Sequence, residues 1–242
     1  DNTSKITGTQ GQLSTLMSSE AARLTTNGNT GIVDQALEVT GGGTISVSQA
    51  NDLNTTTTGV VTASIATGSR WSNGGVDLED LAGTGNAYTI VVNAADKDAL
   101  TAGNLNSLNT ATTVAVNAAA VTTLASDSLS NVNTALAAAD DGTISNLSAL
   151  TKITLNDTSV AAGDLNTAIT EAAKVEGALN QTKFEIDSVA TITGGMDAVT
   201  TLLASEAARL LTGGAAGIVD QKFDINASGE TITVAEANSM NN

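Results

Sequence analysis

Four stretches of the chain carry apolar residues at spacings of three and four, which is the pattern of a helix with one buried face. In the first stretch the stripe consists of Leu13, Leu16, Met17, Ala21 and Leu24. We therefore predict four amphipathic helices, each packed by one face against the rest of the fold. The other three stretches are Val121–Ala135, Leu165–Ala172 and Val199–Leu210.

Short runs rich in β-branched residues lie between these stretches. Several alternate polar and apolar positions, as Lys152–Asn156 does, and this alternation is typical of strands with one buried face. Glycine- and asparagine-rich turns separate the runs. The candidate strands are Lys5–Thr7, Leu37–Thr40, Thr44–Val47, Val60–Ile65, Tyr88–Asn93, Thr112–Asn117, Gly142–Ser145, Lys152–Asn156, Phe184–Asp187, Thr191–Thr193, Phe223–Asn226 and Thr231–Val234.

A local motif that ends in Leu-Asn recurs at Ala50–Asn54, Ala102–Asn106 and Ala161–Asn166. Asn and Asp side chains accept hydrogen bonds from the free N–H groups of a helix start or an Asx turn. We interpret the motif as a cap whose leucine anchors the segment.

The chain also repeats itself over a long distance. Ser19–Leu24 returns letter for letter at Ser205–Leu210, and Gly31–Gln35 returns at Gly217–Gln221, so both copies lie 186 residues apart (205 − 19 and 217 − 31). Such a period indicates a repeat array, which builds length and surface. We expect residues 1–187 to form one full repeat unit and residues 188–242 to begin the next, continuous with the same solenoid.

The predicted fold class is α/β, as a repeat solenoid of short parallel strands and amphipathic helices. Only 2% of the residues are aromatic, although 41% are hydrophobic, so the core must be built from small, thin layers that suit a solenoid. A compact α/β domain is the alternative, because the short repeats vary in length and Trp71–Gly85 departs from their rhythm. Trp71 itself is either an anchor under a loop or an exposed contact residue.

The formal net charge of −16 repels phosphate backbones and anionic membranes, so we expect no nucleic-acid partner. No run of 18 apolar residues occurs, so we expect no direct membrane insertion and place any targeting segment outside residues 1–242. The chain has no cysteine and therefore no disulfide framework. The acidic, lysine-poor composition favours an extracellular or cell-surface location.

Histidine and cysteine are both absent, which excludes imidazole and thiol catalysis and the zinc sites built on them. Asp77, Glu79 and Asp80 could serve a carboxylate-based hydrolase, yet their spacing favours a solvated helix start. Gly41–Gly43 and Gly83–Gly85 lack the rest of a phosphate-loop motif and are interpreted as turns. We predict no catalytic residues and no enzyme activity.

We predict no required cofactor, and calcium is the ligand that the remaining chemistry suits best. Oxygen donors gather at Asp140–Gly142, at Asn156–Asp157 and at the repeated turn of Asp34 and Asp220. No EF-hand loop or glycine-aspartate nonapeptide accompanies them, so a structural turn is the preferred interpretation at each place. Glu20 with Arg23, and Glu206 with Arg209, have the spacing of helix ion pairs.

Four segments resemble repeat regions of giant bacterial surface proteins: Ile192–Gly195, Leu202–Leu211, Gly217–Gln221 and Thr231–Val234. These include the very large cell-surface proteins associated with non-flagellar swimming in marine cyanobacteria. The resemblance implies an exported, non-enzymatic, cell-surface array, with calcium dependence as a further implication.

We therefore expect a structural module, either a spacer, a coat or a filament element, whose partners are neighbouring repeats stacked head to tail. An adhesin-like module is the alternative, in which threonine-rich strands at Thr55–Thr58 and Thr191–Thr193 bind a glycan, a mineral or ice.

Overall fold

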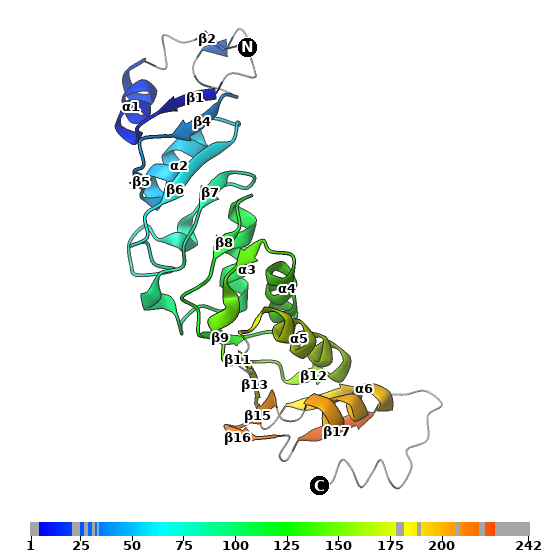
Figure 1. The fold of residues 1–242 in the computed structure, drawn as a ribbon. Helices are drawn as coiled ribbons and strands as arrows, with labels where there is room; N and C mark the ends of the chain where they lie inside the picture. Colours follow the sequence, from blue (N-terminus) through cyan, green and yellow to red (C-terminus); the bar gives the residue numbers. More distant parts are fainter. Residues whose placement is uncertain are drawn as a thin grey trace, which may run out of the picture. The chain divides into compact units, whose positions relative to one another are not determined.

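The computed structural model shows a mixed α/β protein with several parallel sheets and helices. It divides into two compact units, which are described separately (Figure 1). The first unit comprises Asp1–Asp96, Asn104–Ala120 and Gly142–Ser145, and the second comprises Lys97–Gly103, Val121–Asp141 and Asn146–Asn242. The structure describes residues 5–20, 25–26, 29–30, 32, 34–177, 182–187, 190–206, 209–217 and 221–225.

The first unit is built on a five-stranded parallel sheet with the order β1-β4-β6-β5, in which β7 also pairs with β6. Alternate side chains point into the core, so Leu37 and Val61 are fully buried where their strands pair. The strands are β1 (Lys5–Gly8), β4 (Ala36–Val39), β5 (Thr44–Ile45), β6 (Val61–Ile65) and β7 (Ala87–Thr89), with a second parallel pair, β8 (Val116–Asn117) and β10 (Ile144–Ser145), and a hairpin of β2 (Thr25–Thr26) and β3 (Asn29–Thr30).

Short helices connect these strands. Helix α1 (Gln10–Thr15) is followed directly by a π-helical turn (Leu16–Glu20), and α2 (Val47–Thr56) begins with a capping box between Ser46 and Gln49. Two 3₁₀ turns, Leu78–Asp80 and Ala94–Asp96, follow later in the unit. Helix α3 (Ala102–Ala111) contributes residues to both units.

The second unit contains two sheets. One has the order β16-β15-β13-β11-β9 and is parallel except for the β15–β16 hairpin, and the other is the parallel sheet β12-β14-β17. Phe184 of β13 is fully buried in this unit. The strands are β9 (Thr123–Asp127), β11 (Lys152–Leu155), β12 (Ser159–Ala161), β13 (Lys183–Ile186), β14 (Thr191–Gly194), β15 (Leu210–Thr212), β16 (Ala215–Ala216) and β17 (Lys222–Ile225).

Helices α4 (Leu129–Asp140), α5 (Ala162–Val175) and α6 (Met196–Thr201) cover these sheets, with α4 packed on α5 and α5 packed on α6 (Figure 1). A 3₁₀ turn (Leu147–Ala149) precedes β11, and a π-helical turn (Leu202–Glu206) extends α6. The inward face of α5 consists of small and branched residues: Ala162, Leu165, Ala168, Ile169 and Ala172.

Elements near the two ends of the chain match at the spacing of the sequence repeat. β1 corresponds to β14, α1 to α6, and β4 to β17, each with the same length in both copies. The pairing register matches as well, because Lys5 pairs with Ala36 just as Thr191 pairs with Lys222. The two π-helical turns and the two hairpins also correspond.

Several predictions from the sequence are confirmed and others are wrong. The helices at α1, α5 and α6 and most strand candidates are present, whereas Val121–Ala135 is helical only from Leu129. Residues 123–127 instead form β9, because Leu124 is buried where the strand pairs with β11. Val47 begins a helix, and Thr231–Val234 lies outside the described residues.

The Leu-Asn motif is not a cap. The copies at α2 and α3 lie inside the helix, and the copy at α5 begins at the N-cap residue Ala161, which makes no side-chain cap bond. The leucines Leu53, Leu105 and Leu165 are buried, as predicted for anchors. The expected boundary at residue 187 concerns the sequence repeat and stays a prediction, since the two compact units are divided elsewhere.

Candidate functional site

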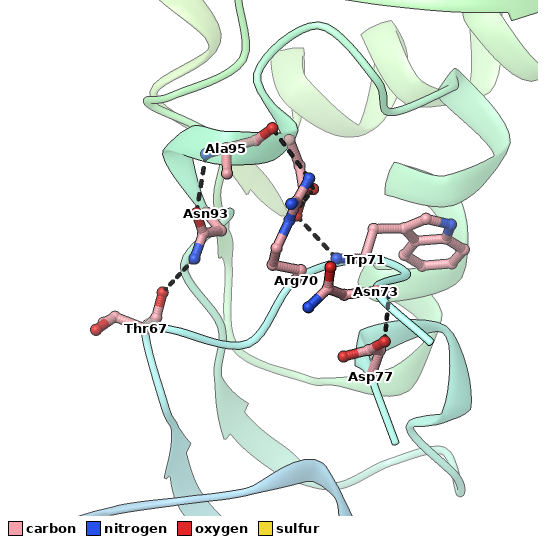
Figure 2. Close-up of polar contacts among 8 residues, drawn as sticks. Thr67, Arg70, Trp71, Asn73, Asp77, Asn93 and Ala95 are labelled. Carbon is pink, nitrogen blue, oxygen red and sulfur yellow. Dashed lines mark hydrogen bonds and ion pairs between the residues drawn. The ribbon is translucent and has the colours of Figure 1, made fainter. Parts of the chain in front are cut away.

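A loop between β6 and β7 is held in place by Asp96. The Asp96 carboxylate, whose side chain is 3% exposed, accepts hydrogen bonds from Arg70 Nε at 2.9 Å and Nη2 at 2.7 Å, and from the Trp71 N–H at 2.8 Å. Figure 2 shows the Arg70 side chain reaching toward the 3₁₀ turn that carries Ala95. A neighbouring bond from Asn93 Nδ2 to the Thr67 carbonyl, at 2.9 Å, fixes the start of the loop.

The Trp71 indole is half-buried and points away from these polar contacts (Figure 2). Farther along the loop, Asp77 is the N-cap of the 3₁₀ turn and accepts a hydrogen bond from the Gly75 N–H at 3.2 Å. Val76 is 56% exposed beside it. The loop is thus held by hydrogen bonds of its own, and Asp77, Glu79 and Asp80 lie at the start of a 3₁₀ turn, in line with the predicted helix start.

A hollow of about 360 Å³ lies at the carboxyl ends of the second unit's strands. Carboxyl ends of parallel strands are where ligands bind in many α/β proteins. The hollow offers hydroxyl, amide and carboxylate groups. Its lining residues are Ser126, Thr154, Leu155, Asn156, Glu185, Ile186, Asp187 and Gly213.

The central carboxylate of this hollow is already engaged. Glu185 Oε2 lies 3.0 Å from Lys152 Nζ and accepts a hydrogen bond from Thr154 Oγ1 at 3.3 Å. The arrangement can bind polar groups by hydrogen bonds, and its hydroxyl–carboxylate contact, Thr154 with Glu185, is shared with the Lys152 ammonium.

Two other carboxylates of the second unit have shifted pKa values. Partial burial acts to raise the pKa of Asp127, but hydrogen bonds from Gly103 N–H, Asn131 and Ser128 N–H outweigh it and the pKa is lowered. Burial likewise acts to raise the pKa of Glu176, and the Arg209 guanidinium, with the Thr182 N–H, lowers it below its usual value.

The ion pair of Arg209 differs from the one predicted, which was an i,i+3 helix pair with Glu206. Arg209 pairs with Glu176, at 2.6 Å and 3.0 Å, and lies beyond the helix in which a Glu206 pair was expected. The side chains of Glu20, Arg23 and Glu206 lie outside the described residues.

The candidate calcium turns are used internally where the structure describes them. Asp140 pairs with Lys174 Nζ at 2.9 Å, and Asp157 accepts a hydrogen bond from the Leu129 N–H at 2.7 Å. Asp34 accepts a long hydrogen bond of 3.5 Å from Gln35, and Asp220 lies outside the described residues. Within the described ranges, no three acidic side chains are grouped so that they could hold a metal ion.

Buried threonines link neighbouring segments. Thr57 Oγ1 donates to the Gln35 carbonyl at 2.6 Å, Thr112 Oγ1 to the Tyr88 carbonyl at 2.7 Å, and Thr182 Oγ1 to the Leu150 carbonyl at 3.1 Å. Thr57 and Thr112 directly follow helices α2 and α3, and Thr182 directly precedes β13, so each bond ties the chain just ahead of one strand to the region of an earlier strand. Sequence patterns gave no sign of these long-range bonds.

Asparagines of the helices make similar links. In the second unit, Asn133 Nδ2 donates to the Asp164 carbonyl at 3.3 Å, and Asn166 Nδ2 donates to the Ala198 carbonyl at 2.9 Å. Each asparagine thus bonds to the first turn of the next helix. The Asn166 of the Leu-Asn motif therefore acts between helices rather than as a cap.

The threonines proposed for an adhesin face are largely engaged. Thr55 and Thr56 belong to helix α2, not to a strand, and their hydroxyls donate to the Asp52 carbonyl at 2.9 Å and 2.8 Å. Thr57 is 7% exposed. Thr191 and Thr193 lie on β14, where they are half-buried.

Comparison with protein-family models, with curated proteins and with solved structures finds no match for this chain. None of the described helices combines the length and apolar character needed to span a membrane.

Proposed function

We propose that the chain is a structural repeat module of a large secreted or cell-surface protein, in which it serves as a spacer, coat or filament element without catalytic activity. The observation that carries this proposal is the repeat of whole elements. β1, α1 and β4 return as β14, α6 and β17 at the spacing of the sequence repeat and in the same register.

The finer proposal for the fold is a solenoid made of windings, where a winding is a strand, its helix and the return to the next parallel strand. Parallel registers such as Lys5 with Ala36, and Lys152 with Lys183, are what successive windings would give. The hydrogen bonds of the buried threonines and of the helix asparagines support the same proposal, because they join segments one winding apart.

The resemblance to giant bacterial surface proteins favours an exported array, with a role in motility as one use of it. The net charge of −16 favours solubility in a salty medium and keeps neighbouring arrays apart. We propose that no cofactor is required for this role.

Small-angle X-ray scattering of the full chain tests the solenoid. A compact 242-residue domain has a radius of gyration of about 18 Å, and we expect a clearly larger value with an elongated distance distribution. A value near that of the compact domain would refute the solenoid.

Antibodies against the full chain test the location. We expect them to label intact cells of the organism that makes the protein, and protease treatment of those cells should remove the signal. Labelling only after lysis would refute a surface role while leaving the solenoid untouched.

A further inference from the structure

The first strand and helix leave open a face that their counterparts have covered. β14 lies between β12 and β17, whereas β1 pairs with β4 on one side and has no partner on the other among the described strands. The two corresponding helices differ in the same way, because one side of α1 is an open groove and the same side of α6 is covered. α6 and its π-helical turn are packed against α5.

Side chains of β1 and α1 are more exposed than their counterparts on β14 and after α6. Ile192 on β14 is 0% exposed, whereas its counterpart on β1, Ile6, is only half-buried. Leu202 is 0% exposed after α6, whereas its counterpart Leu16 is half-buried. The residues are identical in both pairs, so what differs is the covering segment.

The uncovered side of α1 forms a groove of about 510 Å³, lined by Thr9, Gly11, Gln12, Thr15 and Leu16. At the corresponding surface of α6, Asn166 of α5 donates a hydrogen bond to the Ala198 carbonyl. Ala198 is the counterpart of Gln12. The groove thus lies where α5 would sit.

We propose that this face, β1 together with the α1 groove, is the docking surface for a copy of Ser159–Ile186 placed directly ahead of Asp1 in a tandem of repeats. The inference rests on the proposed array. Within this chain β12 pairs with β14, α5 covers α6, and β13 pairs with β15, the counterpart of β2. Asp187 is the counterpart of Asp1, so a copy that ends at Ile186 would join with the native spacing.

The groove differs from its counterpart at three of its five lining positions: Thr9, Gly11 and Gln12 stand where the second copy has Gly195, Asp197 and Ala198. The Gln12 side chain is turned back onto its own helix start, where Oε1 accepts a hydrogen bond from the Thr9 N–H at 2.9 Å. Its backbone carbonyl remains the counterpart of the one that Asn166 reaches. The three differences therefore change side chains at the groove, whereas the backbone carbonyl at position 12 is kept as an acceptor.

Hydrogen–deuterium exchange on the full chain, with and without a copy of residues 159–186 fused ahead of Asp1, tests the proposal. The Thr191 N–H donates to the Thr158 carbonyl at 3.0 Å and serves as the internal standard. In the unmodified chain, we expect its counterpart, the Lys5 N–H, to exchange faster by about tenfold or more. In the extended chain, the two rates should converge.

A matched pair of substitutions gives an independent readout. In the unmodified chain, Leu16→Ala should lower the melting temperature by less than half as much as Leu202→Ala, and in the extended chain the two losses should become equal. The control extension carries aspartate at the copies of Val160 and Ile169, which line the buried side of β12 and α5.

Unchanged Lys5 exchange in the extended chain, or protection that persists with the aspartate control, would overturn the docking proposal. Either result is distinct from a failure of the proposed function, because the scattering and labelling experiments use the unmodified chain. If scattering shows a compact unmodified chain and the Lys5 N–H is protected in the extended chain, the solenoid is refuted and the docking proposal stands.

Discussion

Removing the Asp96 carboxylate should release the loop that carries the only tryptophan. Asp96→Ala eliminates both hydrogen bonds from Arg70 and the acceptor of the Trp71 N–H. Truncating one partner of a buried ion pair costs about 3–5 kcal/mol. The Arg70 side chain is 34% exposed and can be rehydrated, so the expected cost is lower, about 2–3 kcal/mol.

This loss corresponds to a fall of ~5–10 °C in melting temperature for a chain of this size. The assay is thermal unfolding followed by circular dichroism, together with the emission of Trp71, the single tryptophan. Because Trp71 is half-buried, loosening of the loop should shift its emission to longer wavelength. Asp96→Asn, which keeps the shape and one acceptor, should show a smaller effect on both measurements.

Glu79→Gln is the matched control, since Glu79 is an exposed carboxylate of the same loop. It should change the melting temperature by no more than about 1 °C, within the range of ordinary surface substitutions. An Asp96→Ala variant with the wild-type melting temperature and the wild-type Trp71 emission wavelength would refute the anchoring role.

Three further outcomes are expected. Gly59→Ala should destabilise by more than about 2 kcal/mol, because the added Cβ would lie 2.5 Å from the Gln35 carbonyl oxygen; denaturation at the wild-type midpoint would contradict the packing. The lowered pKa of Glu176 contributes stability that is fully present above the unfolded-state pKa of about 4.3 and is lost as the pH falls through the lower folded-state pKa. The melting temperatures of wild type and Glu176→Gln should therefore converge in acid. A difference that stays constant with pH would count against the Arg209 pair. Chelator should leave the melting temperature unchanged at fixed ionic strength, whereas a large drop would show that calcium stabilises the fold.

The longer periodic segments were predictable, because their pattern is unambiguous over several turns. The stripe through Leu165, Ile169 and Ala172 lies on one buried face of α5. Short segments are different, since four or five residues fit both helix and strand periods. Residues 123–127 extend an apparent helical stripe but form β9, because pairing with β11 outweighs local pattern.

The polar contacts of the candidate sites were not predictable from local patterns. Asp96 lies 26 residues from Arg70, and Glu176 lies 33 residues from Arg209. Neither spacing has a sequence signature, because the distance between partners is set by the length of the intervening segments. The Leu-Asn motif did carry a signal, but a cap and a link between helices require the same residue type at nearly the same place.

The chain's shortage of aromatic residues explains why polar links matter to this fold. Fully buried aromatic side chains such as Phe184 are rare here, so each layer of the core contributes a modest apolar area. Hydrogen bonds such as those from Thr182 and Asn166 add about 0.5–1.5 kcal/mol each and fix the register between segments. If the fold is the proposed solenoid, these links join adjacent windings, and each added winding would bring its own set. Stability would then grow with the number of windings, which is what a length-building module requires.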